Sequence, residues 1–406
     1  MNDKQYWAEL NLYTDALNLE YPWFVVDRQF DKINGRLDIY LTFDRRATFT
    51  CAACGAPHQP FHDVNLKDRV WRHLDFFEYE AYLHAPLPRV TCGYCGKVKA
   101  AHIPWARPGR GLTQKFELLI LELVKCMPVL NVAKQVRLHD TRIWRVVHDY
   151  VDKALEKMDL SDLKRVAIDE TSAKKGHNYI SLVVDLDVGK VVFVTEGKDA
   201  GTLRQFKKHL EEKKGNAQQI TTFCSDLSPA FIQGVKEEFP RAAHVFDKFH
   251  VMKMANEAVD KVRRQEQREH PELKNSRYLW LKNENKLTVK QQEQLVRLKD
   301  MNLQTGRAYR LKLAFQDFWK QNALLADVYL DHWYQWAIRS RIQPMVEFAQ
   351  SIRRHEAGIL QWFIAKVSNG VLEAINSLVQ AAKAKARGYR TQKNLIAMVY
   401  MIAGKL

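Results

Sequence analysis

The chain has 406 residues, of which 46% are hydrophobic and 27% charged, so its length predicts two to four folded units and its composition excludes an intrinsically disordered chain. No apolar stretch is long enough to span a bilayer and the first twenty residues carry no secretory pattern, which predicts a cytoplasmic protein. Lys and Arg outnumber Asp and Glu by 63 to 47, and the net charge of +16 favours a nucleic acid as partner, with a merely basic or ribosome-adjacent protein as the alternative.

The first fifty residues predict small β structure. Asn34-Gly35 separates two apolar runs, residues 23–26 and 37–41, and this dipeptide between such runs is typical of a tight hairpin. More β-like sequence follows around residues 76–87, inside the segment that carries most of the cysteines.

Four of the six cysteines form two pairs with the same spacing. Each pair places two soft sulfurs close together, and four thiolates suit one closed tetrahedral Zn²⁺ site. Four reduced thiols without a metal are the alternative, and a disulfide framework is not expected in such a chain. The two remaining cysteines, Cys126 and Cys224, stand in apolar surroundings and are predicted to be core residues. The predicted zinc ligands are Cys51, Cys54, Cys92 and Cys95.

The stretch 113–155 predicts a helix-turn-helix. Its first helix is stopped by Pro128, a short second segment follows, and Asp140 is a candidate N-cap for the third helix. Arg142 and Arg145 lie three apart on that helix, so one face can reach phosphates or guanine edges. A three-helix bundle without any DNA contact is the alternative.

Beyond residue 165 the pattern becomes that of an α/β sheet domain followed by a long helical stretch. Three adjacent strands are followed by helix and strand in alternation. Residues 252–346 are helical and rich in aromatic and charged residues. The predicted strands are 166–169, 179–185, 190–195, 220–224 and 243–246, and the predicted helices between them are 202–213 and 229–238.

Two aspartates follow apolar strands of this predicted sheet. Asp169 and Asp226 each come where a strand is expected to end and the sheet to open to solvent, and hard carboxylate oxygens from different elements are what two Mg²⁺ ions require. Glu170 is excluded from the same site because successive strand residues face opposite sides. A loop cap or turn residue is the alternative for either aspartate.

A third carboxylate lies near the C-terminus, on a predicted helix that starts at Ser368-Asn369-Gly370. Glu373 is followed at helical spacing by Asn376, Gln380, Lys383 and Arg387, a stripe that is first polar and then basic. A carboxylate at one end and cations further along suit metal binding beside a DNA backbone. A solvated helix face is the alternative.

These segments, in this order, resemble bacterial insertion-sequence transposases of the ISL-three family. The resemblance covers roughly Cys51 to Met401, and several motifs together are more specific than any one. The motifs are Ile168-Asp169-Glu170-Thr171, Ser225-Asp226-Leu227-Ser228-Pro229, Phe246-Asp247-Lys248-Phe249-His250, Tyr278-Leu279-Trp280-Leu281-Lys282-Asn283, and Ser368-Asn369-Gly370 through Glu373 to Asn376 with Gly388-Tyr389-Arg390.

The resemblance implies a multidomain α/β fold with a zinc-ribbon-like module, a helix-turn-helix, and an RNase H-like catalytic domain interrupted by an all-helical insertion. It places Asp169, Asp226 and Glu373 on an Asp-Asp-Glu triad that binds Mg²⁺ or Mn²⁺. Where the family usually has Glu-Gly before the Asn, this chain has Glu373-Ala374-Ile375-Asn376, and alanine is compatible with the helix. The implied site-adjacent residues are Asp247, His250 and Asn376.

The function expected from this resemblance is that of a DNA transposase that binds the terminal repeats of its element and cleaves and joins DNA. A non-catalytic DNA-binding regulator and a structure-specific RNase H-like nuclease remain the alternatives. Double-stranded DNA and a second copy of the chain are the expected partners, and binding to DNA implies association with the nucleoid. The expected DNA-binding residues are Arg142, Arg145, Lys383, Lys385, Arg387 and Arg390. The expected domains are an N-terminal β segment (1–48), a zinc-binding domain (49–108), a helix-turn-helix (109–158), a catalytic domain (159–254 and 355–406) and a helical insertion (255–354).

Overall fold

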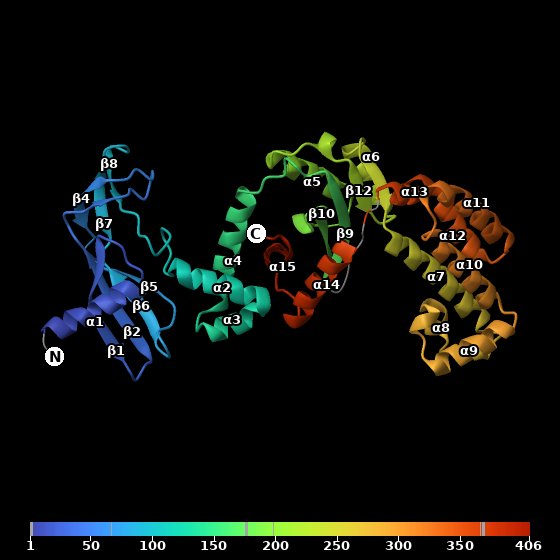
Figure 1. Cartoon of the computed structure of the whole chain (residues 1–406), viewed down its shortest axis with the longest axis horizontal. Coiled ribbons are helices and arrows are strands. Elements are labelled where there is room, and N and C mark those ends of the chain that lie inside the picture. Colours follow the sequence, from blue (N-terminus) through green and yellow to red (C-terminus); the bar gives the residue numbers. More distant parts are fainter. Residues whose placement is uncertain (1–2, 66, 175–177, 198, 366, 368–369) are drawn as a thin grey trace. The chain divides into compact units, whose positions relative to one another are not determined.

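The computed structural model describes residues 3–65, 67–174, 178–197, 199–365, 367 and 370–406. The chain separates into two compact units, residues 1–146 and 147–406, and the boundary falls inside helix α4 (Asp140–Glu156). Each unit is described by itself, with the elements labelled in Figure 1. None of the described helices is long and apolar enough to cross a membrane.

The first unit opens with a helix and a four-stranded sheet. The hairpin predicted around Asn34-Gly35 is present: β1 runs antiparallel to β2, Asp31 lies opposite Arg36, and Gly35 has a φ of +60°. Alternate residues of β2 are buried, as expected for a sheet with one covered face. The strand order is β1-β2-β6-β5. The bounds are α1 Asp3–Ala16, β1 Trp23–Asp31, β2 Arg36–Phe43, β5 Arg69–Arg72 and β6 Glu80–Ala85.

A second four-stranded sheet, of order β3-β4-β7-β8, shares its hydrophobic core with the first. The Trp105 ring meets Trp23 and Trp71 edge-on, with ring centroids 4.7 and 5.6 Å apart, and Cys51 and Cys92 are buried in the same cluster. The predicted division of this region at residues 48 and 49 remains a prediction. The bounds are β3 Thr48–Phe49, β4 Gln59–Val64, β7 Pro88–Cys92 and β8 Lys97–Ala100.

The helix-turn-helix consists of α2 (Gln114–Cys126), α3 (Val129–Gln135) and α4. Thr113 caps α2 by accepting a hydrogen bond from the backbone N–H of Phe116. The predicted N-cap of α4 was wrong by one residue: Asp140 is already helical, and the ring Nδ1 of His139 accepts from the backbone N–H of Thr141 at 3.3 Å. The N-cap acceptor of α4 is therefore the imidazole nitrogen of His139 and not the carboxylate of Asp140.

The second unit is built on a five-stranded sheet of order β11-β10-β9-β12-β13. Strand β9 runs antiparallel to β10, β10 antiparallel to β11, β12 parallel to β9, and β13 parallel to β12. Four of the strands were predicted within two residues of their bounds, whereas β9 extends five residues beyond its predicted end at Asp169. Their bounds are β9 Arg165–Lys174, β10 Asn178–Asp185, β11 Lys190–Glu196, β12 Thr222–Ser225 and β13 Ala243–Phe246.

Helices cover both faces of this sheet. On one face, α5 (Ala200–Glu212) and α6 (Pro229–Glu238) bury Phe206 and Phe231 against Ile168 and Phe223. Because side chains alternate along a strand, Asp169 and Thr171 point to the other face, where α14 (Gly370–Lys385) and α15 (Gln392–Ala403) lie beside β9 and β11. The predicted helix start at Ser368-Asn369 lies outside the described residues.

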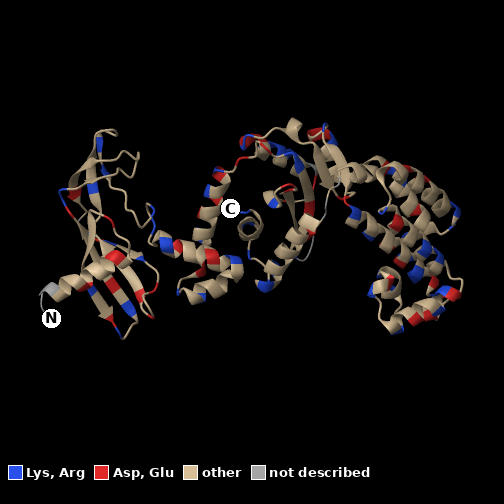
Figure 2. Ribbon diagram, in the orientation of Figure 1, with Lys and Arg blue, Asp and Glu red and all other residues tan. Residues whose placement is uncertain are grey.

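Between β13 and α14 the chain forms a set of helices with its own core. Trp280 and Phe315 are fully buried there, whereas Trp336 is 48% exposed. Acidic and basic positions are interspersed along these helices (Figure 2). The bounds are α7 Lys248–Glu266, α8 Arg277–Leu281, α9 Val289–Asp300, α10 Gln304–Phe318, α11 Ala323–Arg339, α12 Gln343–Arg354 and α13 Glu356–Ala365.

Candidate active site and zinc centre

The four paired cysteines of the first unit converge on one point. Their sulfur atoms all lie within 4.8 Å of one another, and the Sγ atoms of Cys54 and Cys92 are 3.6 Å apart. Four sulfurs around one tetrahedral Zn²⁺ with Zn–S bonds of about 2.3 Å are spaced by roughly 3.8 Å, so this set fits the ion. Among the described Cys, His, Asp and Glu residues, no other group of three or more is compact enough to hold a metal.

Both cysteine pairs are shaped by the glycine that follows them. Gly55 and Gly96 have φ of +75° and +65°, and their backbone N–H groups donate to the carbonyl oxygens of Cys51 and Cys92, each at 2.9 Å. Two identical turns therefore present two sulfurs each. Burial opposes ionisation of Cys51, but hydrogen bonds from its own turn lower the pKa of this thiol to about 7, which favours the thiolate that zinc binds.

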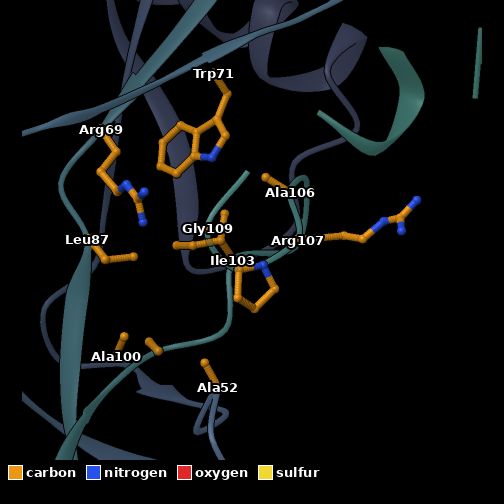
Figure 3. Close-up of a pocket in the computed structure, with 11 residues that line it drawn as sticks. Ala52, Arg69, Trp71, Leu87, Ala100, Ile103, Ala106, Arg107 and Gly109 are labelled. Atoms are coloured by element: carbon orange, nitrogen blue, oxygen red, sulfur yellow. The ribbon is translucent and has the colours of Figure 1, made fainter. Parts of the chain in front are cut away.

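A small cavity of about 70 Å³ lies near this centre (Figure 3). The indole of Trp71 and the side chains of Leu87 and Ile103 line it, and its walls are mostly apolar. Arg107, which also borders it, forms an ion pair with Glu117 at 2.9 Å. Neither the zinc ligands nor the predicted DNA-binding arginines line the cavity.

In the second unit, Asp169 is half-buried in the middle of β9, not at its end as the sequence analysis expected. The strand continues because β10 pairs with it as far as Lys174, whereas β12 pairs with it only up to Ala167. The neighbouring strand therefore stops just before Asp169, and this opens the sheet beside it. Burial raises the pKa of the Asp169 carboxyl.

Asp226 follows the last residue of β12, as predicted. Its Oδ1 accepts from the backbone N–H of Ser228 at 2.9 Å, so one carboxylate oxygen supports the turn into α6. The loop-cap alternative is thus part of its role. In the described part of the chain, no side chain or backbone N–H donates to its other oxygen, Oδ2, which is therefore available to a ligand.

His250 links these two aspartates to a third. Its Nδ1 lies 2.8 Å from Oδ2 of Asp247, whose side chain is buried and whose Oδ1 accepts from the backbone N–H of Phe249 at 2.7 Å. The hydrogen bond to Asp247 raises the pKa of His250, and the charges of Asp169 and Asp226 act in the same direction. One imidazole therefore lies within electrostatic range of all three acids.

Helix α14 runs alongside β9 in the same direction. Asn376 Nδ2 donates to Asp169, Gln380 Nε2 donates to the hydroxyl of Thr171, and Lys383 Nζ donates to the carbonyl oxygen of Ser172. The Oδ1 atom of Asn376 is buried and has no hydrogen-bond partner among the residues that the structure describes. An orphaned oxygen next to a buried carboxylate suits a hard cation, which prefers oxygen ligands.

Glu373 lies one helical turn before Asn376, on the same stripe of α14, and its side chain is exposed. The structure brings Asp169, Asp226, Asp247 and His250 together, but the described carboxylates do not form a group as compact as the cysteines. The position of Glu373 as a ligand therefore remains a prediction.

The predicted DNA-binding residues lie in two places. Arg142 and Arg145 are exposed on α4, and Nη2 of Arg142 is 3.5 Å from the carbonyl oxygen of Gly111. At the end of α14, Lys383 is half-buried, and the carbonyl oxygen of Arg390 accepts from Lys174 Nζ at 2.8 Å. The residues exposed there are Lys385, Arg387 and Arg390.

Comparisons with known proteins decide the family. The profile of the ISL3 transposases matches residues 166–399, which span the five-stranded sheet, the helical part and α14. The chain belongs to the ISL3 family of transposases. The helix-turn-helix profile of transposase family ISL3 matches residues 101–151, and the zinc-finger profile of the IS204/IS1001/IS1096/IS1165 transposases matches residues 47–95.

Relatives match this ISL3-family transposase over most of its length. The transposase for insertion sequence element IS1557 of Mycobacterium tuberculosis is 30% identical over 386 residues, covering 86% of this chain and 85% of the relative. The transposase for insertion sequence element IS1001 of Bordetella parapertussis is 30% identical over 371 residues, covering 88% and 89%. Membership of this family implies an enzyme that cleaves and transfers DNA, with a helix-turn-helix that binds it and a structural zinc ion.

Proposed function

We propose that this transposase binds the terminal repeats of its insertion sequence and catalyses strand cleavage and strand transfer with Asp169, Asp226 and Glu373. The observation that carries the proposal is the convergence of Asp169 and Asp226 with Asn376, a residue from the far end of the chain. Acids from separate elements around one opening in a sheet are the arrangement that phosphoryl-transfer chemistry requires.

The strand order of the second unit supports an RNase H-like catalytic domain. Three antiparallel strands, β9 to β11, are joined at β9 by two parallel strands, β12 and β13. The proposed carboxylates lie on the central strand β9, after its neighbour β12, and on α14. Helices α7 to α13 stand between β13 and α14, and we propose that residues 255–354, from within α7 to the end of α12, form the insertion.

We propose that Asp169, Asp226 and Glu373 hold Mg²⁺ or Mn²⁺. The bound metal would activate the attacking oxygen and stabilise the charge of the phosphate at both cleavage and joining. Asp169 and Asp226 each have an oxygen set by the backbone, since they accept from the N–H groups of Glu170 and Ser228. Asn376 orients the remaining oxygen of Asp169, and its own Oδ1 is buried without a hydrogen-bond partner among the described residues.

We propose that His250 is a positioning residue. Its hydrogen bond to Asp247 fixes the ring, and the charges of Asp169 and Asp226 act on it, so it would help to position the acidic cluster around the substrate phosphate. The exposed arginines of α4 and the basic end of α14 would contact DNA, the former at the element ends. Two ends must be joined in one reaction, which suits a dimer or larger assembly.

The test is a cleavage and joining assay. Purified full-length protein is incubated with labelled DNA that carries the ends of its element and a target plasmid, with Mg²⁺ or Mn²⁺. We expect cleaved and joined products, both lost in Asp169→Asn. Glu170→Gln is the matched control, because strand alternation points this neighbouring acid to the opposite face, and it should retain activity.

Other outcomes identify the two alternatives. Sequence-specific binding with no cleavage by the unmodified protein would indicate a regulator. Cleavage without joining would indicate a nuclease. Equal loss of activity in Glu170→Gln and Asp169→Asn would refute the choice of Asp169 over its neighbour.

A further inference from the structure

The second unit contains a groove that the proposed active site does not use. It has a volume of about 360 Å³ and is lined by β13 on one side and by the junction of α12 with α13 on the other. Gly358 makes this packing possible, because a Cβ at this position would lie 2.4 Å from the ring of Phe246. The polar residues that line the groove are His244, Arg354, His355 and Gln361, and no carboxylate lines it.

Two adjacent arginines at the end of α12 differ in their partners. Arg353 is paired with Asp331 at 3.1 Å and with Glu356 at 2.8 Å. Arg354 is exposed and lines the groove, and in the described part of the chain no carboxylate lies within ion-pair distance of it. The groove therefore contains one cation, Arg354, that no described carboxylate neutralises.

The other polar groups of the groove are uncharged at neutral pH. Burial lowers the pKa of His244 to about 4, and burial followed by the charge of Arg354 lowers the pKa of His355. The groove thus offers one positive charge together with neutral donors: the His355 imidazole, the Gln361 amide, and N–H groups of the first turn of α13, which lack partners in their own helix. One cation surrounded by neutral donors matches a ligand with a single negative charge.

The groove is also connected to the proposed active site. The Nε2 atom of His244 lies 2.8 Å from the hydroxyl of Ser225, and this hydroxyl donates to the carbonyl oxygen of Asp226 at 2.8 Å. Phe246, on the groove wall, is followed directly by Asp247. β13 contains no Asp, Glu, Lys or Arg, and Glu356, the charged residue of α13, is paired with Arg353 at 2.8 Å. β13 and the residue that follows it thus contribute to both the groove and the acidic cluster.

We propose that this groove binds one phosphodiester of the DNA backbone, beside the position where the strand is cleaved, with Arg354 as its cation. A phosphodiester carries one negative charge, which one guanidinium neutralises through paired hydrogen bonds. The proposal rests on the proposed function, because it assumes that DNA is held at the neighbouring carboxylates.

The test measures DNA binding without added Mg²⁺, so that it does not depend on cleavage. Arg354→Gln should weaken binding of a labelled duplex roughly fivefold to tenfold, the low end for a charge-assisted bond at an exposed position. The slope of log affinity against log salt should fall by about 0.9, as for one phosphate contact. Arg354→Lys should restore the slope, and Arg353→Gln, the matched control, should bind within twofold.

Three results would overturn the groove as a DNA contact. Arg354→Gln could bind duplex as tightly as the unmodified protein, Arg353→Gln could weaken binding equally, or a mononucleotide could bind in an Arg354-dependent way while duplex affinity stays unchanged. Equal melting temperatures of the variants show that each is folded. If Asp169→Asn retains cleavage while Arg354→Gln weakens binding, the proposed catalytic site is rejected and the groove is retained. If Asp169→Asn loses cleavage while Arg354→Gln binds duplex normally, only the groove is rejected.

Discussion

Replacement of Cys54 by serine is the sharpest test of the zinc centre. Cys51 and Cys92 are buried in the hydrophobic core, so changing either would also disturb packing, whereas Cys54 is exposed and contributes little besides its sulfur. Structural zinc sites contribute about 10–16 kcal/mol in small peptides, so one of four thiolates accounts for roughly 3 kcal/mol. We therefore expect zinc to bind roughly a hundredfold more weakly in Cys54→Ser.

Competition with a chromophoric chelator measures this affinity directly. Cys126→Ser is the control, because this cysteine is exposed and belongs to the same unit but not to the cluster. The four-sulfur site would be refuted by unchanged zinc affinity in Cys54→Ser, or by an equal loss in Cys126→Ser. If Cys54→Ser loses affinity for the element ends as well as affinity for zinc, the zinc module takes part in DNA recognition.

Two further predictions concern stability. Burial and then the charge of Lys115 lower the pKa of His73 to about 4, so the unfolded state binds the proton first as the pH falls below 6.5. The free energy of unfolding should therefore decrease by about 3 kcal/mol between pH 6.5 and 4. Denaturant titrations at each pH should show a smaller decrease in His73→Asn, and an unchanged pH profile would contradict the assignment. Trp280 is fully buried and its Nε1 donates to the Ser276 hydroxyl at 3.1 Å, so Trp280→Ala should lower the free energy of unfolding by about 3–5 kcal/mol in denaturant titrations. Tyr278 lies on the same helix and is 60% exposed, so Tyr278→Ala should lower it by under about 0.5 kcal/mol. Similar losses in both variants would refute this packing.

Local patterns predicted most of the elements. Residues 229–238 and 243–246 were predicted with the bounds that α6 and β13 have, because proline starts the helix and a short apolar run between polar segments marks the strand. The cysteine spacing predicted a cluster whose four members lie more than forty residues apart at their extremes, since each pair forms its own turn. The repeated glycine after each pair was an additional signal that went unused.

The structure differs from the sequence predictions where contacts between elements decide which residues are helical, buried or paired. Helix α1 was not predicted because Leu10 and Tyr13 are its main buried residues, which is too few for a clear helical period. Cys126 was predicted to be a core residue and is exposed, because it lies at the last turn of α2, away from the side that packs. Asp169 was expected at a strand end, but β9 extends past it through pairing with β10.

The sequence by itself determined the parts of this transposase whose physics is local: turns, helix limits, the paired cysteines, and the order of motifs that places it in its family. Only the tertiary structure decided which side chains meet. Asn376 and Asp169 are 207 residues apart along the chain, and of two adjacent arginines Arg353 is neutralised while Arg354 faces a groove. Such contacts depend on how helices pack on the sheet, and no spacing along the chain encodes that packing directly.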